Sequence, residues 1–507
     1  MSDGLERVCV IIGRSRHKMV VAELQEAVRQ GAKLIELRLD FLAKAIDFQR
    51  LLPYRKCPWV VTLRRPRDGG RWPGTEDERL MILRQAIVSG VDYVDLEEDI
   101  AASVPRFGKV QRIISYHNLI ETPADLDEIY RRMLEIDGDI YKLAVTSQTP
   151  ADNVRILELL RNAPKPTIAH GMGEIGFPTR LLSLKYGSPF TYAAFNRERG
   201  VAPGIPTFDE MRMIYPIGTL NPDTKIFGVA GDPVGHSLSP ILHNLMYREM
   251  EIDALYLPFR IMRGHFQQSV AAYDSIPVSG YSVTIPHKEA AASMTRNLDR
   301  RVIDTGAANT LLRKAKGDFG SWNTDFDAAI DSIRPTPPKN EDGTTIPWNE
   351  VQGLVLGAGG AARAIVHALK REGIAVTVSN RTPERAAKLA AEVEGRSVDW
   401  AARNSVRCQL IINCTPIGMH PNVDESPIHN SVLKPGLVVF DTVYAPENTL
   451  LIKEAKQRGC EVVTGIEMFV RQAAQQFRIF TGQDASLEAM RKLMRKILSP
   501  LGLQSEL

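Results

Sequence analysis

The feature of this sequence that most restricts its fold is a unit repeated through residues 1–218: a short apolar run, a polar turn, and a stretch with apolar residues at helical spacing, such as KMVVAELQEAVRQG. Alternating β and α segments that repeat eight times are typical of a (β/α)8 TIM barrel, so we predict an α/β fold that begins with one. The eight apolar runs begin 19 to 34 residues apart, and they are VCVII (8–12), KLIELRL (33–39), WVVTLR (59–64), YVDLE (93–97), RIISYH (112–117), IYKLAV (140–145), PTIAH (166–170) and FTYAAF (190–195).

Ionisable side chains gather toward the ends of these runs. In a TIM barrel the active site lies at the carboxyl ends of the strands, while the strand bodies form the core. We therefore expect a polar site at one end of the barrel. In chain order the residues concerned are Glu36, Arg38, Arg64, Asp95, Glu97, His117, Lys142 and His170.

Lys142 is the residue in this set with the most specific chemistry. It alternates with Ile140 and Ala144 on one face of its run, and both faces of a barrel strand are covered, so its ammonium should be withdrawn from water. Burial disfavours the charged form of a lysine, and a neutral amine can attack a ketone to form a Schiff base that promotes loss of a neighbouring proton. His117 ends the preceding run and is expected to act as base and then acid. The alternative for Lys142 is a structural ion pair with a carboxylate.

Length, charge and cysteine content narrow the functional class. The 507 residues exceed a typical domain of about 150 residues several times over, so at least two functional units are expected. Sixty-three Lys and Arg against 60 Asp and Glu give a net charge of +3 without long blocks, which predicts no nucleic-acid partner. Five scattered cysteines predict neither a metal site nor disulfides, and fit a cytoplasmic protein. No apolar run approaches the length of about 18 residues that a membrane span needs, and the first residues form no signal-peptide core.

The pattern restarts after the barrel. A stretch rich in Pro, Asn and Asp at residues 219–224 is the predicted linker, and a new strand begins near Lys225. Residues 225–333 alternate strands and helices. A polar, Pro-rich stretch at 334–350 then precedes VQGLVLGAGGAARAI, where an apolar strand runs through glycines into an alanine-rich helix.

This glycine-rich turn has the strand–turn–helix context that a dinucleotide phosphate requires. The next strand, AVTVSN, ends without an acidic residue that would bind a ribose hydroxyl, and the arginine that follows it favours the 2′-phosphate of NADP. The alternative is an ordinary βα turn. The candidate cofactor residues are Gly357, Ala358, Gly359, Gly360, Ala361, Asn380, Arg381 and Thr382.

Three further motifs bring ionisable and hydroxyl residues into probable loops. GYSVTIPHKEAA carries Lys288, NTDFDAA carries Asp325, and GHSLSP carries Ser237 and Ser239. An exposed lysine and aspartate would be unremarkable singly, but together with the two hydroxyls they suggest a pocket for a polyol with a carboxylate.

Residues 225–507 resemble shikimate dehydrogenase. The resemblance rests on GHSLSP, SVTIPHK, GAANTL, NTDFDAA, GAGGAARAI, NRT, INCTPIGM, DTVYAPENT and the glutamine in FVRQAAQQF, all in family order. It implies that residues 225–333, completed by C-terminal helices at about 466–507, bind substrate, and that 345–465 form a Rossmann-like NADP domain. It also implies that Lys288 and Asp325 are the catalytic pair, without deciding which gives the proton. The implied substrate residues are Ser237, Ser239, Thr284, Asn309, Tyr444 and Gln472, and Ser282 departs from the asparagine of many bacterial members.

Residues 6 to about 215 resemble type I 3-dehydroquinate dehydratase through IELRLD, VVTLRR, YVDLEED, SYHN and DIYKLAVTSQTP. This resemblance implies that Lys142 forms the Schiff base, that His117 is the acid/base, and that Glu36, Arg38, Arg64 and Arg180 contact the substrate, with Arg180 holding its carboxylate. The sequence departs from the family at three positions. The glutamate that supports the histidine is Asp68 here, and a serine and a glutamine that also hold the carboxylate are Val201 and Ile205.

The two resemblances together imply a bifunctional enzyme of the kind known from plants. It would dehydrate 3-dehydroquinate in the barrel and reduce 3-dehydroshikimate to shikimate with NADPH, without a metal. Two alternatives remain: an active dehydrogenase whose barrel is weakened or only binds and stabilises, and an NAD-dependent quinate-type dehydrogenase. No prediction of oligomeric state follows.

Overall fold

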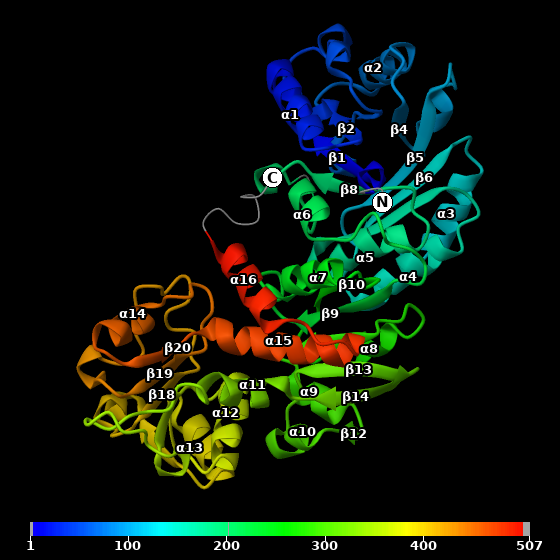
Figure 1. Cartoon of the computed structure of the whole chain (residues 1–507). Coiled ribbons are helices and arrows are strands. Elements are labelled where there is room, and N and C mark those ends of the chain that lie inside the picture. Colours follow the sequence, from blue (N-terminus) through cyan, green and yellow to red (C-terminus); the bar gives the residue numbers. More distant parts are fainter. Residues whose placement is uncertain (1–3, 201, 500–507) are drawn as a thin grey trace. The chain divides into compact units, whose positions relative to one another are not determined.

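The computed structural model describes residues 4–200 and 202–499, and it divides into two compact units at the junction of Val278 and Ser279 (Figure 1). The first unit holds the predicted barrel and the first strands of the second half. The second unit holds the remainder of the chain. Each unit is described by itself.

Eight parallel strands form the barrel, and all eight predicted runs are confirmed as strands. They hydrogen-bond in the order β7-β6-β5-β4-β3-β2-β1-β8, so the sheet curls into a nearly closed barrel, blue to green in Figure 1. Their bounds are β1 Val8–Ile12, β2 Leu34–Arg38, β3 Trp59–Thr62, β4 Tyr93–Glu97, β5 Gln111–Asn118, β6 Ile140–Thr146, β7 Thr167–Met172 and β8 Thr191–Ala194.

Helices connect most of these strands. Their N-termini are capped as the sequence favours: Thr75 and Thr207 each accept a hydrogen bond from the backbone of a glutamate three residues on, whose carboxylate returns to the capping residue. The helices are α1 His17–Arg29, α2 Glu76–Val88, α3 Leu126–Leu134, α4 Pro150–Arg161, α5 Gly173–Lys185 and α6 Phe208–Met213.

The regular alternation fails at two connections. In the described chain, β2 is followed only by 3-10 turns at Leu39–Phe41, Phe48–Arg50 and Leu52–Tyr54, and β4 only by one at Ala101–Ser103. Proline lacks the N–H that an interior helical position needs. Pro53 lies in the first of these connections and Pro105 in the second, where each restricts the length of an α-helix.

The barrel interior is layered along its axis. An apolar layer that includes Cys9, Leu34, Val60, Ile113, Ile140 and Ile168 lies toward the amino ends of the strands. Further along, the register pairs Lys142 with Ser115 on β5 and with Ile168 on β7. One level higher, Ala144 pairs with His117 on one side and His170 on the other. Because register neighbours in parallel strands share a face, the two histidines flank a small alanine above the lysine.

The first unit continues beyond the barrel with a parallel strand pair, β9 Lys225–Gly231 and β10 Ala254–Arg260, and with helices α7 Ser239–Glu249 and α8 Phe266–Ala272. The strand predicted to begin near Lys225 is thereby confirmed.

The second unit contains two groups of strands. The first joins β11 Gly280–Val283, β13 Thr310–Ala315, β14 Asp318–Trp322 and β12 Asn297–Leu298, with helices α9 Lys288–Ser293, α10 Arg300–Thr305 and α11 Thr324–Ile333. The second is a parallel sheet in the order β17-β16-β15-β18-β19-β20, which is the strand order of a Rossmann fold. Its strands are β15 Gln352–Leu356, β16 Ala375–Asn380, β17 Arg396–Asp399, β18 Leu410–Asn413, β19 Val438–Asp441 and β20 Glu461–Val463.

Five helices complete the second unit: α12 Gly360–Arg371, α13 Pro383–Glu392, α14 Leu450–Gln457, α15 Gly465–Thr481 and α16 Leu487–Leu498. Helix α15 packs against α11 and α16. The predicted α/β class, with a barrel followed by a Rossmann-like domain, is confirmed.

Candidate active sites

A cavity of about 370 Å³ opens at the carboxyl ends of the barrel strands. It gathers most of the residues that the strand ends predicted, together with residues of α5 and of the loop after β8. Its lining residues include Glu36, Arg38, Arg64, Asp68, His117, Lys142, His170, Arg180, Tyr192 and Ile205.

Lys142 lies at the bottom of this cavity and is 5% exposed. Its Nζ donates a hydrogen bond to Asp95 Oδ2 at 2.9 Å and lies 3.9 Å from Glu36 Oε1. The ammonium also sits 4.3 Å from the centre of the Tyr192 ring, a cation–π distance. Lys142 therefore has the carboxylate partner expected if it formed only a structural ion pair. Its ammonium also faces a cavity large enough for a small substrate.

Asp95 joins Lys142 to Arg64. Arg64 Nη2 lies 2.9 Å from Asp95 Oδ1, and Ser115 Oγ donates to the same carboxylate oxygen at 2.6 Å. Burial by itself would raise the pKa of Asp95, but the charges of Arg64 and Lys142 outweigh it and hold that pKa well below its usual range. Asp95 is thus a permanent anion beneath the cavity.

His117 lies beside this ion-pair network. Arg64 Nη1 is 3.0 Å from His117 Nδ1, and because a guanidinium can only donate, Nδ1 accepts and the neutral ring carries its proton on Nε2. Burial lowers the pKa of His117 well below its usual value, and the charges of Arg64 and Lys142 lower it further. His117 is therefore neutral in the free enzyme.

The structure does not bring Asp68 to His117. Asp68 Oδ2 accepts from Arg65 Nε at 2.5 Å, and among the described residues no hydrogen bond joins Asp68 to the imidazole. Its side chain is one methylene shorter than glutamate, and the neighbouring guanidinium holds it. Arg64 Nη1 contacts His117 Nδ1 instead.

The other two residues predicted for this site on β2 have firm positions. Glu36 is 3% exposed and accepts from Thr62 Oγ1 at 2.7 Å. Arg38 forms two parallel hydrogen bonds of 2.9 Å to Asp40 at the mouth of the cavity.

Arg180 differs from the other arginines of the cavity. It is 1% exposed, and its Nε and Nη2 have no hydrogen-bond partner among the described residues. Burial alone lowers its pKa to about 10. A buried guanidinium without a counter-ion is unfavourable, so this position suits an anionic ligand.

The loop after β8 closes one side of the cavity beside α5. Gly173 N donates to Pro203 O at 3.1 Å. A Cβ at Gly204 would lie 2.2 Å from Gly173 O, so only glycine permits this approach. Ile205 lines the cavity and packs against the apolar barrel layer. Val201, which by the family resemblance replaces a serine that holds the substrate carboxylate, lies outside the described residues.

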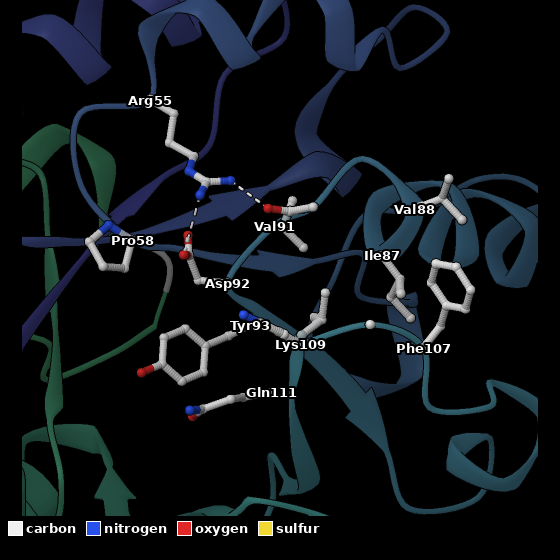
Figure 2. Close-up of a pocket in the computed structure, with 13 residues that line it drawn as sticks. Arg55, Pro58, Ile87, Val88, Val91, Asp92, Tyr93, Phe107, Lys109 and Gln111 are labelled. Carbon is white, nitrogen blue, oxygen red and sulfur yellow. Dashed lines mark hydrogen bonds and ion pairs between the residues drawn. The ribbon is translucent and has the colours of Figure 1, made fainter.

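A second hollow, of about 460 Å³, lies at the opposite, amino ends of β3, β4 and β5 (Figure 2). Arg55 and Asp92 pair with each other across it, and Asp92 also accepts from Trp59 N at 2.8 Å. The charges of Arg55 and Asp92 therefore stabilise the ends of the strands. The hollow brings together no lysine–histidine pair among its described lining residues, so the chemistry lies at the other end of the barrel.

The predicted catalytic pair of the second half meets within the second unit. Lys288 Nζ, at the start of α9, donates to Asp325 Oδ2 on α11 at 2.6 Å. The two side chains are 15% and 11% exposed, so the pair is shielded but open to a small ligand. Thr284, in the turn before α9, is partly buried, and its carbonyl accepts from His287 N.

Asn309 anchors the loop next to this pair. It is 2% exposed, its Oδ1 accepts from Thr324 N at 2.8 Å, and its Nδ2 donates to Thr324 Oγ1 at 2.9 Å. The buried Gln476 supports it from α15: its Nε2 donates to Asn309 O at 3.1 Å, and its Oε1 accepts from Ser282 Oγ at 2.7 Å. The serine that departs from the family pattern therefore has a defined partner.

The remaining substrate candidates occupy different places. Tyr444 packs its ring 4.7 Å from Phe469, and burial raises its pKa. Gln472 donates to Phe469 O one turn before Gln476 on α15. Ser237 and Ser239 belong to the first unit, where Ser239 N donates to Ser237 Oγ at 3.3 Å at the start of α7.

The glycine-rich turn has the geometry that a pyrophosphate needs. Gly357 has φ 112°, and a Cβ there would lie 2.9 Å from Cys414 O. Gly359 caps α12, and nothing lies within 4 Å of the position its Cβ would take. Ala358 and Ala361 are partly buried on either side of Gly359 and Gly360. The open face at the start of a 12-residue helix leaves space for a phosphate.

The end of β16 is exposed. Asn380 Nδ2 donates to Thr382 O at 3.0 Å, and within the described chain the guanidinium of the exposed Arg381 has no recorded hydrogen bond or ion pair. Asp399 faces Asn380 in the register with β17, which places a carboxylate near this turn that the sequence pattern did not reveal.

Several residues of these sites had no role assigned from sequence. Asp95 and His170 were visible at strand ends, and the register of β4 to β7 is what gives them partners and neighbours. Tyr192 alternates with apolar residues on β8, and Gln476 follows Gln472 by one helical turn, a spacing that places both on one face of α15.

Other sequence expectations concern metals, disulfides and membranes. Across residues 4–200 and 202–499, no group of three or more His, Cys, Asp and Glu is arranged to hold a metal ion. All five cysteines are free. Over that same range, none of the helices has both the length and the apolar character needed to cross a membrane.

Comparison with known families gives four matches along the chain. The matches are, in order, type I 3-dehydroquinase at residues 8–222, the shikimate dehydrogenase substrate binding domain at 229–311, shikimate/quinate 5-dehydrogenase at 344–415, and the shikimate 5'-dehydrogenase C-terminal domain at 465–495.

Individual relatives agree with these matches. The chain is 35% identical over 506 residues to a chloroplastic bifunctional 3-dehydroquinate dehydratase/shikimate dehydrogenase of Arabidopsis thaliana, covering 96% of this chain and 83% of the relative. It is 39% identical over 279 residues to a shikimate dehydrogenase (NADP+) of Methanocella arvoryzae, covering 54% of this chain and 99% of the relative. A crystal structure of a shikimate dehydrogenase in complex with NADP+ matches 55% of this chain and 97% of its own, with 30% identity and a TM-score of 0.50.

Proposed function

This chain belongs to the family of bifunctional 3-dehydroquinate dehydratases/shikimate dehydrogenases, and from that premise we propose how its own residues carry out the two reactions. The barrel is a type I dehydroquinase, a lyase, and the remainder is an NADP-dependent shikimate dehydrogenase, an oxidoreductase. The product of the first reaction, 3-dehydroshikimate, is the substrate of the second.

In the barrel, the Lys142 ammonium gives up a proton, and the neutral amine attacks the ketone of 3-dehydroquinate. The proton returns to the former ketone oxygen, which leaves as water when the iminium forms. The observation that carries this assignment is the placement of Lys142 Nζ, 2.9 Å from Asp95 and facing the cavity. Because the iminium keeps the positive charge at the same place, the permanently ionised Asp95 stabilises it as it stabilises the ammonium. The same ion pair therefore serves both states.

His117 is the proton-transfer group for the adjacent carbon. Its Nδ1 lone pair accepts from Arg64 in the free enzyme, so the lone pair becomes available as a base when Arg64 turns toward the substrate. The proton that His117 takes from carbon then leaves with the departing hydroxyl as water. A water molecule hydrolyses the iminium, which frees 3-dehydroshikimate and restores Lys142. Glu36 and Arg38 contact the ring hydroxyls, and Asp68 acts through Arg65.

Arg180 binds the substrate carboxylate. Its two unpartnered nitrogens and its full burial support this role, because a carboxylate would supply the counter-ion that the free site lacks. No other arginine of the cavity is in this condition: Arg38 and Arg64 are both paired with aspartates.

In the dehydrogenase, the carbonyl carbon of 3-dehydroshikimate would receive the hydride that NADPH supplies when it is bound. Lys288 stabilises the charge that develops on the carbonyl oxygen and gives it a proton, and Asp325 orients the ammonium at 2.6 Å. Asn309, Thr284, Tyr444 and Gln472 are the proposed substrate contacts of this unit. Ser237 and Ser239 of the first unit are proposed as substrate-binding residues from the family resemblance alone.

The cofactor residues fit a dinucleotide. The open backbone at Gly359 and Gly360 at the start of α12 can receive the pyrophosphate. Arg381 is exposed and available for the 2′-phosphate of NADP, and Asn380 and Thr382 shape the turn that presents it.

The limits of the domains are part of this proposal: a dehydratase barrel at 1–218, a linker at 219–224, a substrate-binding domain at 225–333 completed by the C-terminal helices, and the NADP domain at 345–465. A cytoplasmic location is also proposed.

Borohydride trapping tests the barrel assignment. Treatment of the full chain with 3-dehydroquinate and borohydride should add one reduced substrate to Lys142, visible by intact mass and peptide mapping. Lys142→Ala should prevent the addition, and His117→Ala should allow it while abolishing turnover. A label that persists in Lys142→Ala, or normal turnover in His117→Ala, would contradict these roles.

Steady-state assays of the same chain separate the two alternatives. A weakened barrel predicts dehydrogenase turnover with no label and no dehydratase turnover. A quinate-type enzyme predicts oxidation of quinate with NAD in preference to shikimate with NADP.

A further inference from the structure

The dehydratase cavity contains a buried histidine that none of the roles above uses. His170 ends β7, is 5% exposed, and lines the cavity with Arg180 and Lys142. Its Nδ1 has no hydrogen-bond partner among the described residues. A histidine buried for structural reasons is normally hydrogen-bonded, because an unsatisfied buried polar group destabilises the fold.

Its surroundings are arranged for a ligand. The register places His170 and His117 on either side of Ala144, one level above Lys142, so the small alanine leaves room between them. The ring of His170 lies 6.1 Å from that of Tyr192, over which Lys142 also sits. His170 therefore lines the same cavity as the reacting amine and Arg180, and the charges of both act on it.

The charges next to His170 are unbalanced. Burial lowers its pKa well below the usual value, and the charges of Arg180 and Lys142 lower it further, so the ring is neutral in the free enzyme. Lys142 has Asp95 as counter-ion, whereas Arg180 has none among the described residues. An anion bound here would gain the full charge of Arg180 and an N–H donor from the imidazole.

We propose that His170 is a substrate-binding residue of the dehydratase, which donates a hydrogen bond to the carboxylate held by Arg180. This inference rests on the proposed dehydratase function. It also explains how the site operates with the apolar Ile205 at a position where an amide would otherwise reach the carboxylate: the donor comes from β7 instead of from the loop after β8.

The test compares His170→Leu, which removes the donor at similar volume, with His170→Gln, which keeps an N–H donor. The assay measures dehydratase kcat and KM of the full chain without NADPH, using 3-dehydroquinate and its methyl ester, which lacks the negative charge. Loss of a hydrogen bond to a charged group predicts that His170→Leu raises KM for the acid about tenfold to a hundredfold. It should change KM for the ester less than about twofold, and His170→Gln should restore most of the loss.

Two further measurements distinguish a loss of substrate binding from a loss of folding. Shikimate dehydrogenase turnover of each variant reports whether the chain is folded. The double variant His170→Leu with Arg180→Met should lose less than the two single losses combined, because both side chains hold one carboxylate. Equal losses for acid and ester, or an unchanged KM for the acid in His170→Leu, would overturn the proposal.

The outcome is separable from that of the proposed function. If the unsubstituted chain neither turns over 3-dehydroquinate nor is labelled by borohydride, the dehydratase assignment itself fails. If it is labelled and His170→Leu binds the acid normally, only the role of His170 fails.

Discussion

Replacing Arg180 by methionine should make the free protein more stable while it raises the dehydratase KM. The guanidinium is 1% exposed and two of its nitrogens have no partner. Burial lowers its pKa to about 10, more than two pH units below that of a free arginine, and each unit corresponds to about 1.4 kcal/mol. The folded state thus bears about 3 kcal/mol for keeping this charge. Methionine keeps the packing of the stem and removes the charge.

The sign and the pH dependence both follow from the lowered pKa. Below about pH 10 the arginine is charged in the folded and the unfolded chain alike, so the penalty is fully present. It disappears only as the pH rises from that value toward the ordinary pKa of arginine. Arg180→Met should therefore raise the free energy of unfolding of the barrel by up to about 3 kcal/mol, with no change between pH 6 and 9.

Arg64→Met is the matched control. Arg64 is also buried, at 2% exposure, but it is paired with Asp95 at 2.9 Å and with Glu97 at 3.3 Å. Removing one partner of a buried ion pair typically costs about 3–5 kcal/mol. The same substitution should therefore stabilise the barrel at one position and destabilise it at the other.

Hydrogen exchange of barrel peptides in urea, followed by mass spectrometry, measures the stability of the barrel within the full chain, since a chain of two units need not unfold in one step. Dehydratase KM is measured in parallel. An Arg180→Met variant that is less stable than the unsubstituted chain across this pH range, or that binds 3-dehydroquinate normally, would contradict this prediction.

Three further substitutions test other parts of the sites. Arg381→Ala should raise KM for NADP much more than KM for NAD, because the contact is to the 2′-phosphate; equal changes in a shikimate oxidation assay would refute it. Ile205→Gln should lower the dehydratase KM by adding a donor to the cavity, and a higher KM in a folded variant would mean that the amide is buried without a partner. Gln476→Leu leaves the buried hydroxyl of Ser282 and the carbonyl of Asn309 without their partner, so it should lower the free energy of unfolding of the second unit by about 2–4 kcal/mol. An unchanged melting temperature would contradict a supporting role for Gln476.

The sequence by itself determined where the strands lie and which of them carry chemistry. Its apolar runs located all eight barrel strands, because a strand covered on both faces must be apolar along its length. The glycine turn at Gly357 was equally local, since its backbone conformation depends on a residue without a Cβ. Lys142, His117 and Arg180 were predicted for the barrel site, and the fold brings them to one cavity.

Only the tertiary structure decided which of these groups meet. Asp95, Arg64 and Lys142 come from three different strands, and their ion pairs depend on sheet register and barrel closure, which leave no trace in local spacing. Asp68, which stands where the family has a glutamate that supports the histidine, is held by Arg65, and Arg64 contacts His117. Competition among neighbouring charges is settled by distances of a few tenths of an ångström, and sequence patterns do not report such distances.

The tertiary structure also decided which buried arginines have a counter-ion. Arg38, Arg64 and Arg180 are chemically the same in the sequence, yet two have carboxylate partners and one has none among the described residues. That difference makes Arg180 and its neighbour His170 a place for an anion. It arises because side chains from α5 and β7 are packed together without an acidic residue, a property that belongs to the assembled barrel and to no single segment of the chain.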